Sequence, residues 1–199
     1  MINSKLKVKS SRLKAGLASS LSKGFTLIEL LIVIAVLGVL ATAVLSAINP
    51  LEQINRGRDT GLRSDSEQIL GAIERFYTAQ QYYPWQVNVG NPKDDSINWV
   101  ALSKATDGTT GVLDKLAQTG TEEIKKSFAD RLKDPKYMLF IYKASGTENS
   151  IYVCFSPRSA SFQTEAQTRC SGTLPTDWPS SACGNTTDCG TKGNCICLP

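Results

Sequence analysis

The sequence predicts an α+β fold, in which a long N-terminal α-helix packs through its second half on a small antiparallel β-sheet. Three observations support this prediction. Residues 25–48 form an uninterrupted apolar segment, and an amphipathic segment continues from it to residue 83. Residues 137–143 and 151–156 are rich in aromatic and β-branched side chains, which favour strands. All six cysteines lie between residues 154 and 197, so a disulfide-rich C-terminal loop is expected.

Positive charge is concentrated at the N-terminus. The 199-residue chain has a net charge of +4, but residues 1–24 hold six basic and no acidic side chains. Residues 25–199 therefore carry 16 basic and 18 acidic residues, and sum to −2. This placement favours membrane orientation over nucleic-acid binding by the main domain. The six basic residues are Lys5, Lys7, Lys9, Arg12, Lys14 and Lys23.

The chain has no histidine, which excludes His-based triads, His general bases and His metal ligands. No phosphate-binding loop, nucleophile elbow or paired-carboxylate site stands out either. An enzyme is therefore not expected.

The apolar segment at residues 25–48 is long enough to span a membrane, and its one charge is Glu29. At a rise of ~1.5 Å per residue its 24 residues form a helix of about 36 Å, against a hydrocarbon layer of ~30 Å. The preceding basic residues place the N-terminus in the cytoplasm and the rest outside. A secretory signal cleaved after small residues is the alternative, although the run is long for one. The small residues are Ala41, Ala43 and Ala47.

The segment at residues 49–83 predicts an amphipathic helix that forms the spine of a globular domain. Its apolar face carries Leu62, Ile69, Ile73 and Phe76. Two i,i+4 ion pairs are expected on the opposite face, Glu52–Arg56 and Asp59–Arg63. Pro50 predicts a kink or a break near the junction with the apolar segment.

Residues 84–199 are expected to form the globular head. Short helices are expected within the connection at residues 84–136, with candidates at 96–105, 112–118 and 121–132, the last beginning near Thr121. A third short strand is expected at Cys195–Leu198. The tail from Pro157 is rich in Ser, Thr, Gly and Pro, so cysteines would have to supply the constraint that its few apolar residues cannot.

The cysteines predict disulfides if the head lies outside the cytoplasm. Cys195-Ile196-Cys197 resembles half of a thiolate metal site, which leaves a metal as the alternative. Six cysteines allow fifteen pairings, and the sequence does not choose among them. Cys154 lies in a predicted strand and is expected to tie the loop to the sheet. The candidates are Cys154, Cys170, Cys183, Cys189, Cys195 and Cys197.

The segment KGFTLIELLIVIAVLGVL, residues 23–40, closely resembles the N-terminal cleavage and methylation motif of type IV prepilins and type II secretion pseudopilins. The resemblance implies that residues 1–24 are a leader, removed by prepilin peptidase between Gly24 and Phe25, and that Phe25 is N-methylated. It implies that Glu29 is needed for assembly and pairs with the Phe25 amine of its own or a neighbouring subunit. In filaments of this family the helix can unwind near positions such as Gly38 and Pro50; the alternative is that Gly38 permits close helix packing in the membrane.

The same resemblance implies a structural protein, a type IV pilus subunit that polymerises into a surface filament for adhesion, motility or DNA uptake. The implied partners are further copies of the chain, prepilin peptidase, minor pilins, membrane lipid before assembly, and an inner-membrane platform with its cytoplasmic ATPase. The rivals are a pseudopilin of a type II secretion or DNA-uptake system and a membrane-anchored exoplasmic binding module. No cofactor is expected.

Three further signals leave alternatives open. Asp177 and Asp188 are candidates for a Ca²⁺ site, although no EF-hand spacing is present. Asn185-Thr186-Thr187 fits a glycosylation acceptor pattern. DNA is a partner that the sequence permits but does not indicate, through a stacking patch whose residues more simply cover the helix. The residues of that patch are Tyr82, Tyr83, Trp85 and Trp99.

Overall fold

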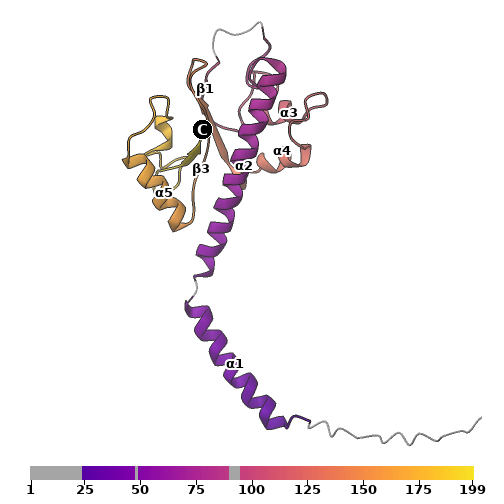
Figure 1. Cartoon of the computed structure of the whole chain (residues 1–199), viewed down its shortest axis with the longest axis vertical. Helices are drawn as coiled ribbons and strands as arrows, with labels where there is room; N and C mark the ends of the chain where they lie inside the picture. Colours follow the sequence, from indigo (N-terminus) through magenta and orange to yellow (C-terminus); the bar gives the residue numbers. More distant parts are fainter. Residues whose placement is uncertain (1–23, 48, 90–94) are drawn as a thin grey trace, which may run out of the picture. The chain divides into compact units, whose positions relative to one another are not determined.

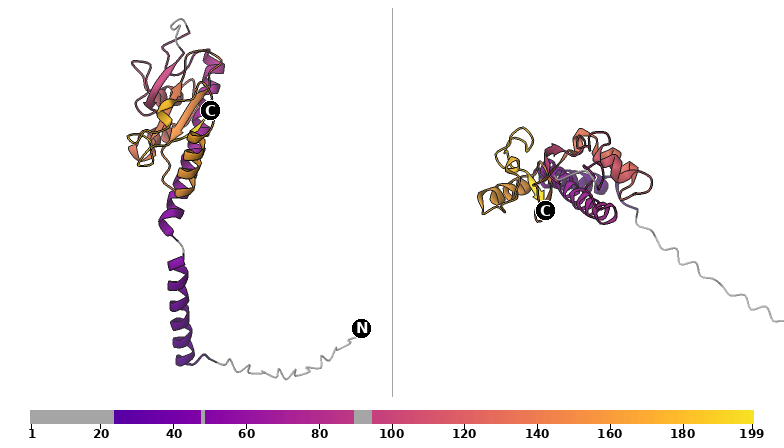
Figure 2. Two further views of the ribbon diagram at one scale, coloured as in Figure 1. Left: turned by 90° about the vertical axis from the view of Figure 1, so that its left-hand side faces the viewer. Right: turned by 90° about the horizontal axis from the view of Figure 1, so that it is seen from above.

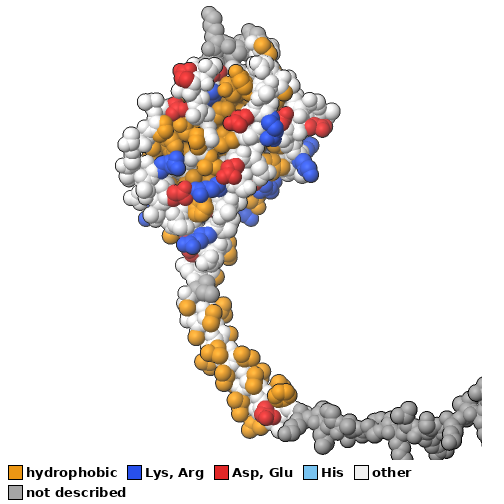
Figure 3. Space-filling view, in the orientation of Figure 1, with side chains coloured by type: hydrophobic (Ala, Val, Ile, Leu, Met, Phe, Trp, Pro, Cys, Tyr) orange, Lys and Arg blue, Asp and Glu red, His pale blue; other side chains and the backbone are white. Residues whose placement is uncertain are grey.

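The computed structural model describes residues 24–47, 49–89 and 95–199, and the chain divides into two compact units, residues 1–48 (unit 1) and 49–199 (unit 2). Only Gly24 of the expected leader lies within the described residues. Unit 1 contains helix α1 (Leu27–Ala47), which continues through Gly38 without a break. Hydrophobic side chains are exposed along α1 (Figure 3). Its 21 residues, with a mean hydropathy of 2.8, make it long and apolar enough to cross a membrane.

Unit 2 opens with helix α2 (Pro50–Gln80), which has its own N-terminal cap. Asn49 has extended backbone angles, and its side-chain oxygen accepts a hydrogen bond from the Glu52 N–H at 3.3 Å. Pro50 occupies the first helical turn, where its missing N–H costs nothing. Asn49-Pro50 therefore starts a new helix. The helix ends where Gln81 adopts a left-handed φ of 63°, shortly before Pro84 as predicted.

Four antiparallel strands form one sheet in the order β1-β2-β3-β4 (Figure 1). The strands are β1 (Ile97–Ala101), β2 (Leu139–Lys143), β3 (Ile151–Phe155) and β4 (Ile196–Leu198). The last three confirm the predicted strands, with β2 starting two residues later than expected. The helix predicted at 96–105 is wrong, because β1 occupies its first part and pairs with β2. Its sequence INWVA, rich in β-branched and aromatic residues, suits a pleated surface.

Two short helices lie between β1 and β2. Helix α3 (Val112–Ala117) confirms the prediction for residues 112–118. Helix α4 (Lys126–Leu132) begins later than predicted, because the residues around Thr121 do not form a helix start. The Thr121 hydroxyl donates to the carbonyls of Lys115 and Gln118, and Glu122 has a left-handed φ of 43°. Two 3-10 turns, η1 (Pro135–Tyr137) and η2 (Ser180–Ala182), complete the helical elements among the described residues.

The strands place alternate side chains in two cores on opposite faces of the sheet. Ile141, Val153 and Phe155 join the first core, which includes the apolar face of α2 with α3 and α4. Phe140, Tyr152 and Cys154 point to the second core, where the C-terminal segment covers the sheet. This period of two follows from the strand geometry. Both faces of the sheet therefore have to be covered, one by helices and the other by the C-terminal segment.

Helix α5 (Ala160–Ser171), which the sequence did not predict, lies beside α2 (Figure 2). Two carboxylates of α2 accept hydrogen bonds from N–H groups at the start of α5 and in the two residues before it. Asp59 is fully buried and accepts from the N–H groups of Arg158 and Ser159 at 2.9 and 2.7 Å. Glu52 accepts from the Ala160 N–H at 3.0 Å, which holds the pKa of Glu52 below its usual value. Side-chain acceptors of this kind satisfy the unpaired donors of a helix start.

This contact corrects one expected ion pair on α2. The Glu52–Arg56 pair is present at 3.2 Å, as predicted. The prediction of an Asp59–Arg63 pair is wrong. Asp59 instead turns inward to α5, and Arg63 pairs with Glu165 of α5. A carboxylate that accepts hydrogen bonds from buried backbone N–H groups is stabilised more than a carboxylate in an exposed i,i+4 ion pair.

A buried ion pair fixes α3 to the segment that follows α2. Lys115 Nζ lies 2.6 Å from Asp107 Oδ2 and donates to the Gln86 carbonyl at 2.6 Å. Burial alone would raise the pKa of Asp107, but bonds from Lys115 and from the Thr110 and Thr109 N–H groups outweigh it and hold this pKa far below its usual value.

Because the folded pKa of Asp107 is depressed, its stabilising contribution is present above the unfolded pKa of about 3.9 and is lost as the pH falls below it. We expect Asp107→Asn to lower the urea midpoint at pH 7 and to reduce its fall between pH 6 and pH 3. Tryptophan fluorescence of the detergent-solubilised chain measures both. Asp130→Asn, at an exposed pair, is the control. An Asp107→Asn profile parallel to that of the wild type would contradict the assignment.

Candidate functional site

The Gly24–Phe25 bond lies in a non-helical segment just before α1. Residues 24–26 are outside the helix, which begins at Leu27. The Phe25 side chain is 84% exposed, and nothing lies within 4 Å of the position that a side chain at Gly24 would occupy. Exposed, non-helical backbone with small residues is where peptidases cut most readily. The expected cleavage point is thus accessible without unwinding the helix.

Thr26 and Glu29 form a reciprocal cap at the start of α1. Glu29 Oε2 accepts from the Thr26 N–H and from the Thr26 hydroxyl, each at 2.8 Å. The Thr26 hydroxyl oxygen in turn accepts from the Glu29 N–H at 3.2 Å. This is a capping box, which satisfies two donors that a helix start leaves free. It fixes Leu27 as the first helical residue.

The cap holds the one acidic side chain of α1 against the end of the helix where negative charge is favourable. The N-terminus of a helix carries partial positive charge, so a carboxylate in its first turn is stabilised. The bonds use atoms of Thr26 and Glu29 only, so removal of residues 1–24 would leave them in place. A new amine on Phe25 would be one residue from the Thr26 N–H that the carboxylate already binds.

Thr26 is not among the site residues predicted from the sequence, although the sequence carries a signal for it. The pattern Thr26-x-x-Glu29 ahead of an apolar run is the sequence signature of a capping box. The resemblance implies that Glu29 pairs with the amine that cleavage creates at Phe25, in its own or a neighbouring subunit, and this stays a prediction. In the uncleaved chain its partner is Thr26.

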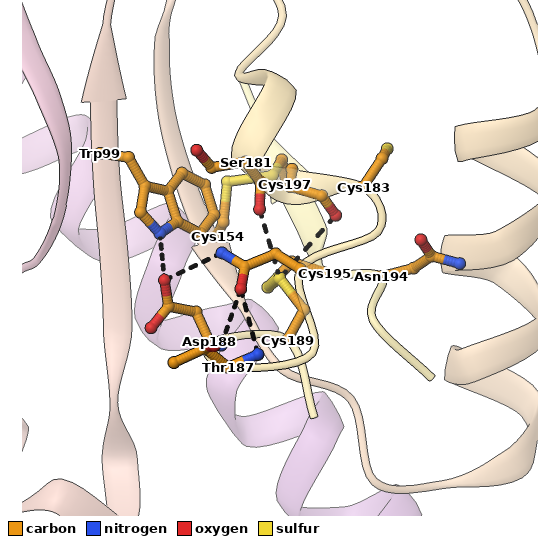
Figure 4. The surroundings of a disulfide bond; sticks show 12 residues. Trp99, Cys154, Ser181, Cys183, Thr187, Asp188, Cys189, Asn194, Cys195 and Cys197 are labelled. Atoms are coloured by element: carbon orange, nitrogen blue, oxygen red, sulfur yellow. Dashed lines mark hydrogen bonds between the residues drawn. A yellow bond between two sulfur atoms is a disulfide. The ribbon is translucent and has the colours of Figure 1, made fainter. Parts of the chain in front are cut away.

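The six cysteines form three disulfides in the C-terminal region: Cys154–Cys197, Cys170–Cys183 and Cys189–Cys195. The first joins the adjacent strands β3 and β4, so Cys154 ties the tail to the sheet. The second links the end of α5 to the residue after η2. The third closes a small loop beside them (Figure 4). The fold brings these three pairs of cysteines together and so selects one of the fifteen pairings, a choice that the sequence alone left open.

A polar contact joins the turn just before this small loop to the sheet. The Trp99 indole N–H, from β1, donates to Asp188 Oδ2 at 2.8 Å, and the Asn185 side-chain amide donates to the same oxygen at 2.9 Å (Figure 4). Asn185 Oδ1 accepts from the Thr187 and Asp188 N–H groups, each at 3.1 Å. The Asn185 side chain, the acceptor of the glycosylation pattern, therefore forms hydrogen bonds within a turn.

The two aspartates considered for Ca²⁺ do not lie in one carboxylate cluster. Asp177 accepts from the Ser150 N–H at 2.8 Å and from the Tyr152 hydroxyl at 3.0 Å. Burial and the hydrogen bond to Asp177 raise the pKa of Tyr152 to about 12. Within residues 24–47, 49–89 and 95–199, no group of three or more Cys, His, Asp or Glu side chains is placed to hold a metal ion.

The four aromatic residues considered for a stacking patch are divided between the two faces of the sheet. Trp85 is buried, with 8% exposed, and covers the first core. Trp99 stacks on Phe140 on the other face of the sheet, with ring centroids 5.0 Å apart. Tyr82 and Tyr83 pack against the first core. The four rings thus do not form one shared surface.

Residues 19–45 match the family model of the prokaryotic N-terminal methylation motif. The chain carries a prepilin-type methylation motif. This motif is the hallmark of type IV pilins and pseudopilins, and it indicates a structural subunit. Comparison with the curated proteins and with the solved structures gives no match.

The prepilin motif covers the accessible Gly24–Phe25 bond, the Thr26–Glu29 cap and most of α1. With the one apolar helix found among the described residues, it fits a single-pass, membrane-anchored precursor.

The cap predicts that Thr26→Ala loosens the start of α1. An N-cap substitution of this kind costs about 1 kcal/mol, so exchange of the Glu29 amide proton should accelerate roughly five-fold. Hydrogen exchange by NMR on the full chain in bicelles measures this. Thr42→Ala is the control, because its hydroxyl donates to the Val39 carbonyl inside the helix. Equal protection of Glu29 in wild type and Thr26→Ala would show that the cap does not form.

Proposed function

We propose that the chain is the precursor of a type IV pilus subunit. Prepilin peptidase cuts it between Gly24 and Phe25 at the cytoplasmic face of the membrane, and Phe25 is then N-methylated. The α1 helix anchors the mature subunit until it enters a filament. The observation that carries this proposal is the Thr26–Glu29 cap, which holds a carboxylate at the start of an exposed apolar helix directly after an accessible Gly24–Phe25 bond.

Exposed apolar surface supports assembly through α1. Every described side chain of this helix is exposed, and 21 residues of such surface need lipid or protein around them. In a filament, the α1 helices of neighbouring subunits replace the lipid. Work for extraction has to come from a separate ATPase and membrane platform.

Glu29 would then set the register between subunits. A charged residue within the membrane costs up to ~3 kcal/mol and normally has a partner. The ammonium group at Phe25 of a neighbouring subunit is such a partner, and a shift in register would leave both charges unmatched. The cap keeps the carboxylate at the end of the helix nearest to that amine.

The three disulfides support a head outside the cytoplasm, because disulfides persist in oxidising compartments. A surface pilus exposes its subunits to the extracellular medium, where such links are useful. A pseudopilin of a secretion system is the rival, and the fraction in which the processed chain is found separates the two.

Mass spectrometry of the N-terminal peptide, from filaments sheared off cells and from membranes, tests the proposal. We expect a peptide that starts at Phe25 and carries one added methyl group in the sheared fraction. The same peptide confined to membranes would assign a pseudopilin. A chain that keeps residues 1–24, or that is cut after Ala47, would exclude both and leave an anchored or secreted binding protein.

Glu29→Ala should be processed but should yield at least ten-fold fewer sheared filaments, because the buried charge pair is lost. Glu29→Gln separates the two roles of this residue, since the amide oxygen can still accept from Thr26 but carries no charge. Immunoblots of sheared and membrane fractions measure both. Glu67→Ala, an exposed acid on α2, is the matched control. Normal filament yield with Glu29→Ala would rule out the register role.

A further inference from the structure

A hollow of about 410 Å³ lies at the C-terminal end of α2, in unit 2. Its walls come from the last turns of α2, from Tyr83, and from residues 149–151 at the start of β3. Tyr77 is 27 residues beyond Pro50, so a straight helix places it about 40 Å from the end of α2 that joins the anchor. The hollow is therefore far from the connection to α1.

Tyr77 and Tyr83, which line the hollow, belong to a stack of three aromatic rings. Tyr77 and Tyr83 are stacked with centroids 4.5 Å apart, and Tyr83 and Trp85 with centroids 4.7 Å apart and planes 2° from parallel. Trp85 is buried, and its indole N–H donates to the Asp95 carbonyl at 3.1 Å. The buried end thus fixes the orientation of the whole stack. Tyr77 is half-buried at the other end, where its outer face meets no further ring among the described residues.

Polar side-chain oxygens with no hydrogen-bond partner among the described residues surround this platform. In the described part of the chain, no residue bonds to the Glu74 carboxylate or to the hydroxyls of Tyr77 and Tyr83. Asn149 uses its amide N–H on the Ser145 carbonyl at 2.5 Å, which leaves its side-chain oxygen as an acceptor. Burial raises the pKa of Tyr83, so its hydroxyl stays protonated and can donate. Polar groups in a recess require water or a ligand as partners.

We propose that this hollow binds a neutral carbohydrate. One face of a pyranose ring presents C–H groups that pack on an aromatic face such as that of Tyr77. The hydroxyls around the ring both donate and accept, which matches the carboxylate of Glu74, the amide oxygen of Asn149 and the tyrosine hydroxyls. The volume lies in the range of small-molecule sites and accommodates one or two sugar rings.

Charge argues against single-stranded nucleic acid as the ligand. Nucleobases also stack on aromatic side chains, but sites for them include basic residues that neutralise phosphates. The charged side chain in this hollow is Glu74, and residues 25–199 sum to −2. A neutral ligand avoids this repulsion. The proposal goes beyond filament assembly and does not depend on it.

Saturation-transfer NMR with the full chain in a zwitterionic detergent that has no sugar headgroup tests the proposal. The probes are lactose, maltose, chitobiose and mannobiose at millimolar concentration. We expect at least one to bind. Tyr77→Ala should weaken it at least ten-fold, and Glu74→Gln several-fold. Tyr137→Ala, which removes a tyrosine of the η1 turn that does not line the hollow, should bind as the wild type does.

Circular dichroism and urea unfolding establish that the variants fold, and the exposed Glu74→Gln provides a readout if Tyr77→Ala does not. Failure of all four sugars to bind would overturn the proposal, as would equal binding by the wild type and Glu74→Gln. A dT12 oligonucleotide that binds the wild type and loses binding in Tyr77→Ala would assign the hollow to nucleic acid instead. Glu29→Ala should leave sugar binding unchanged, so failure here is distinct from failure of the assembly role.

Discussion

The burial of one face of α2 is the constraint on which unit 2 depends. Leu62, Ile69, Ile73 and Phe76 are each at most 1% exposed. Burial of a large apolar side chain stabilises by about 1.5–3 kcal/mol, and these four meet the inner face of the sheet together with α3 and α4. The same helix binds the start of α5 through Asp59 and Glu52. Helix, sheet and C-terminal segment are therefore aligned by contacts to a single element.

The second face of the sheet is stabilised differently, because few aliphatic residues are available to cover it. Aromatic pairs and disulfides take their place, as in the contact of Trp178 with Tyr152 at 5.2 Å between ring centroids. In the chain-entropy view, closing the 43-residue separation between Cys154 and Cys197 stabilises by about 4 kcal/mol, and the six-residue Cys189–Cys195 loop by about 2 kcal/mol. A segment with little core of its own can thus adopt one conformation.

Much of this architecture could be predicted from the sequence, because the signals for it are local. The apolar run, the face of α2, and strands β2 to β4 all follow from the spacing of side chains. The helix predicted over strand β1 is wrong because five residues carry little periodicity, and only pairing with β2 decides their state. Helix α5 was missed because its start is bound by Asp59 and Glu52, about 100 residues earlier in the chain. At the candidate site, the motif predicts roles for Gly24, Phe25 and Glu29, and these stay predictions; the role of Thr26 in the cap was not predicted, although the capping pattern is present in the sequence. The aromatic hollow joins α2 to the β2–β3 turn, a proximity that no local pattern specifies.

The link between Cys154 and Cys197 also has a mechanical consequence. In the proposed filament, a subunit held by its N-terminal helix would carry tension along its backbone, and that tension would enter unit 2 through α2. A force that stretches the chain between α2 and Pro199 bypasses the residues enclosed by the Cys154–Cys197 bond, because the bond carries the load directly. The sequence separation of 43 between the two cysteines corresponds to on the order of 150 Å of extended backbone that pulling cannot release. The C-terminal surface is thus shielded from extension by force, even where the strands and helices ahead of it give way.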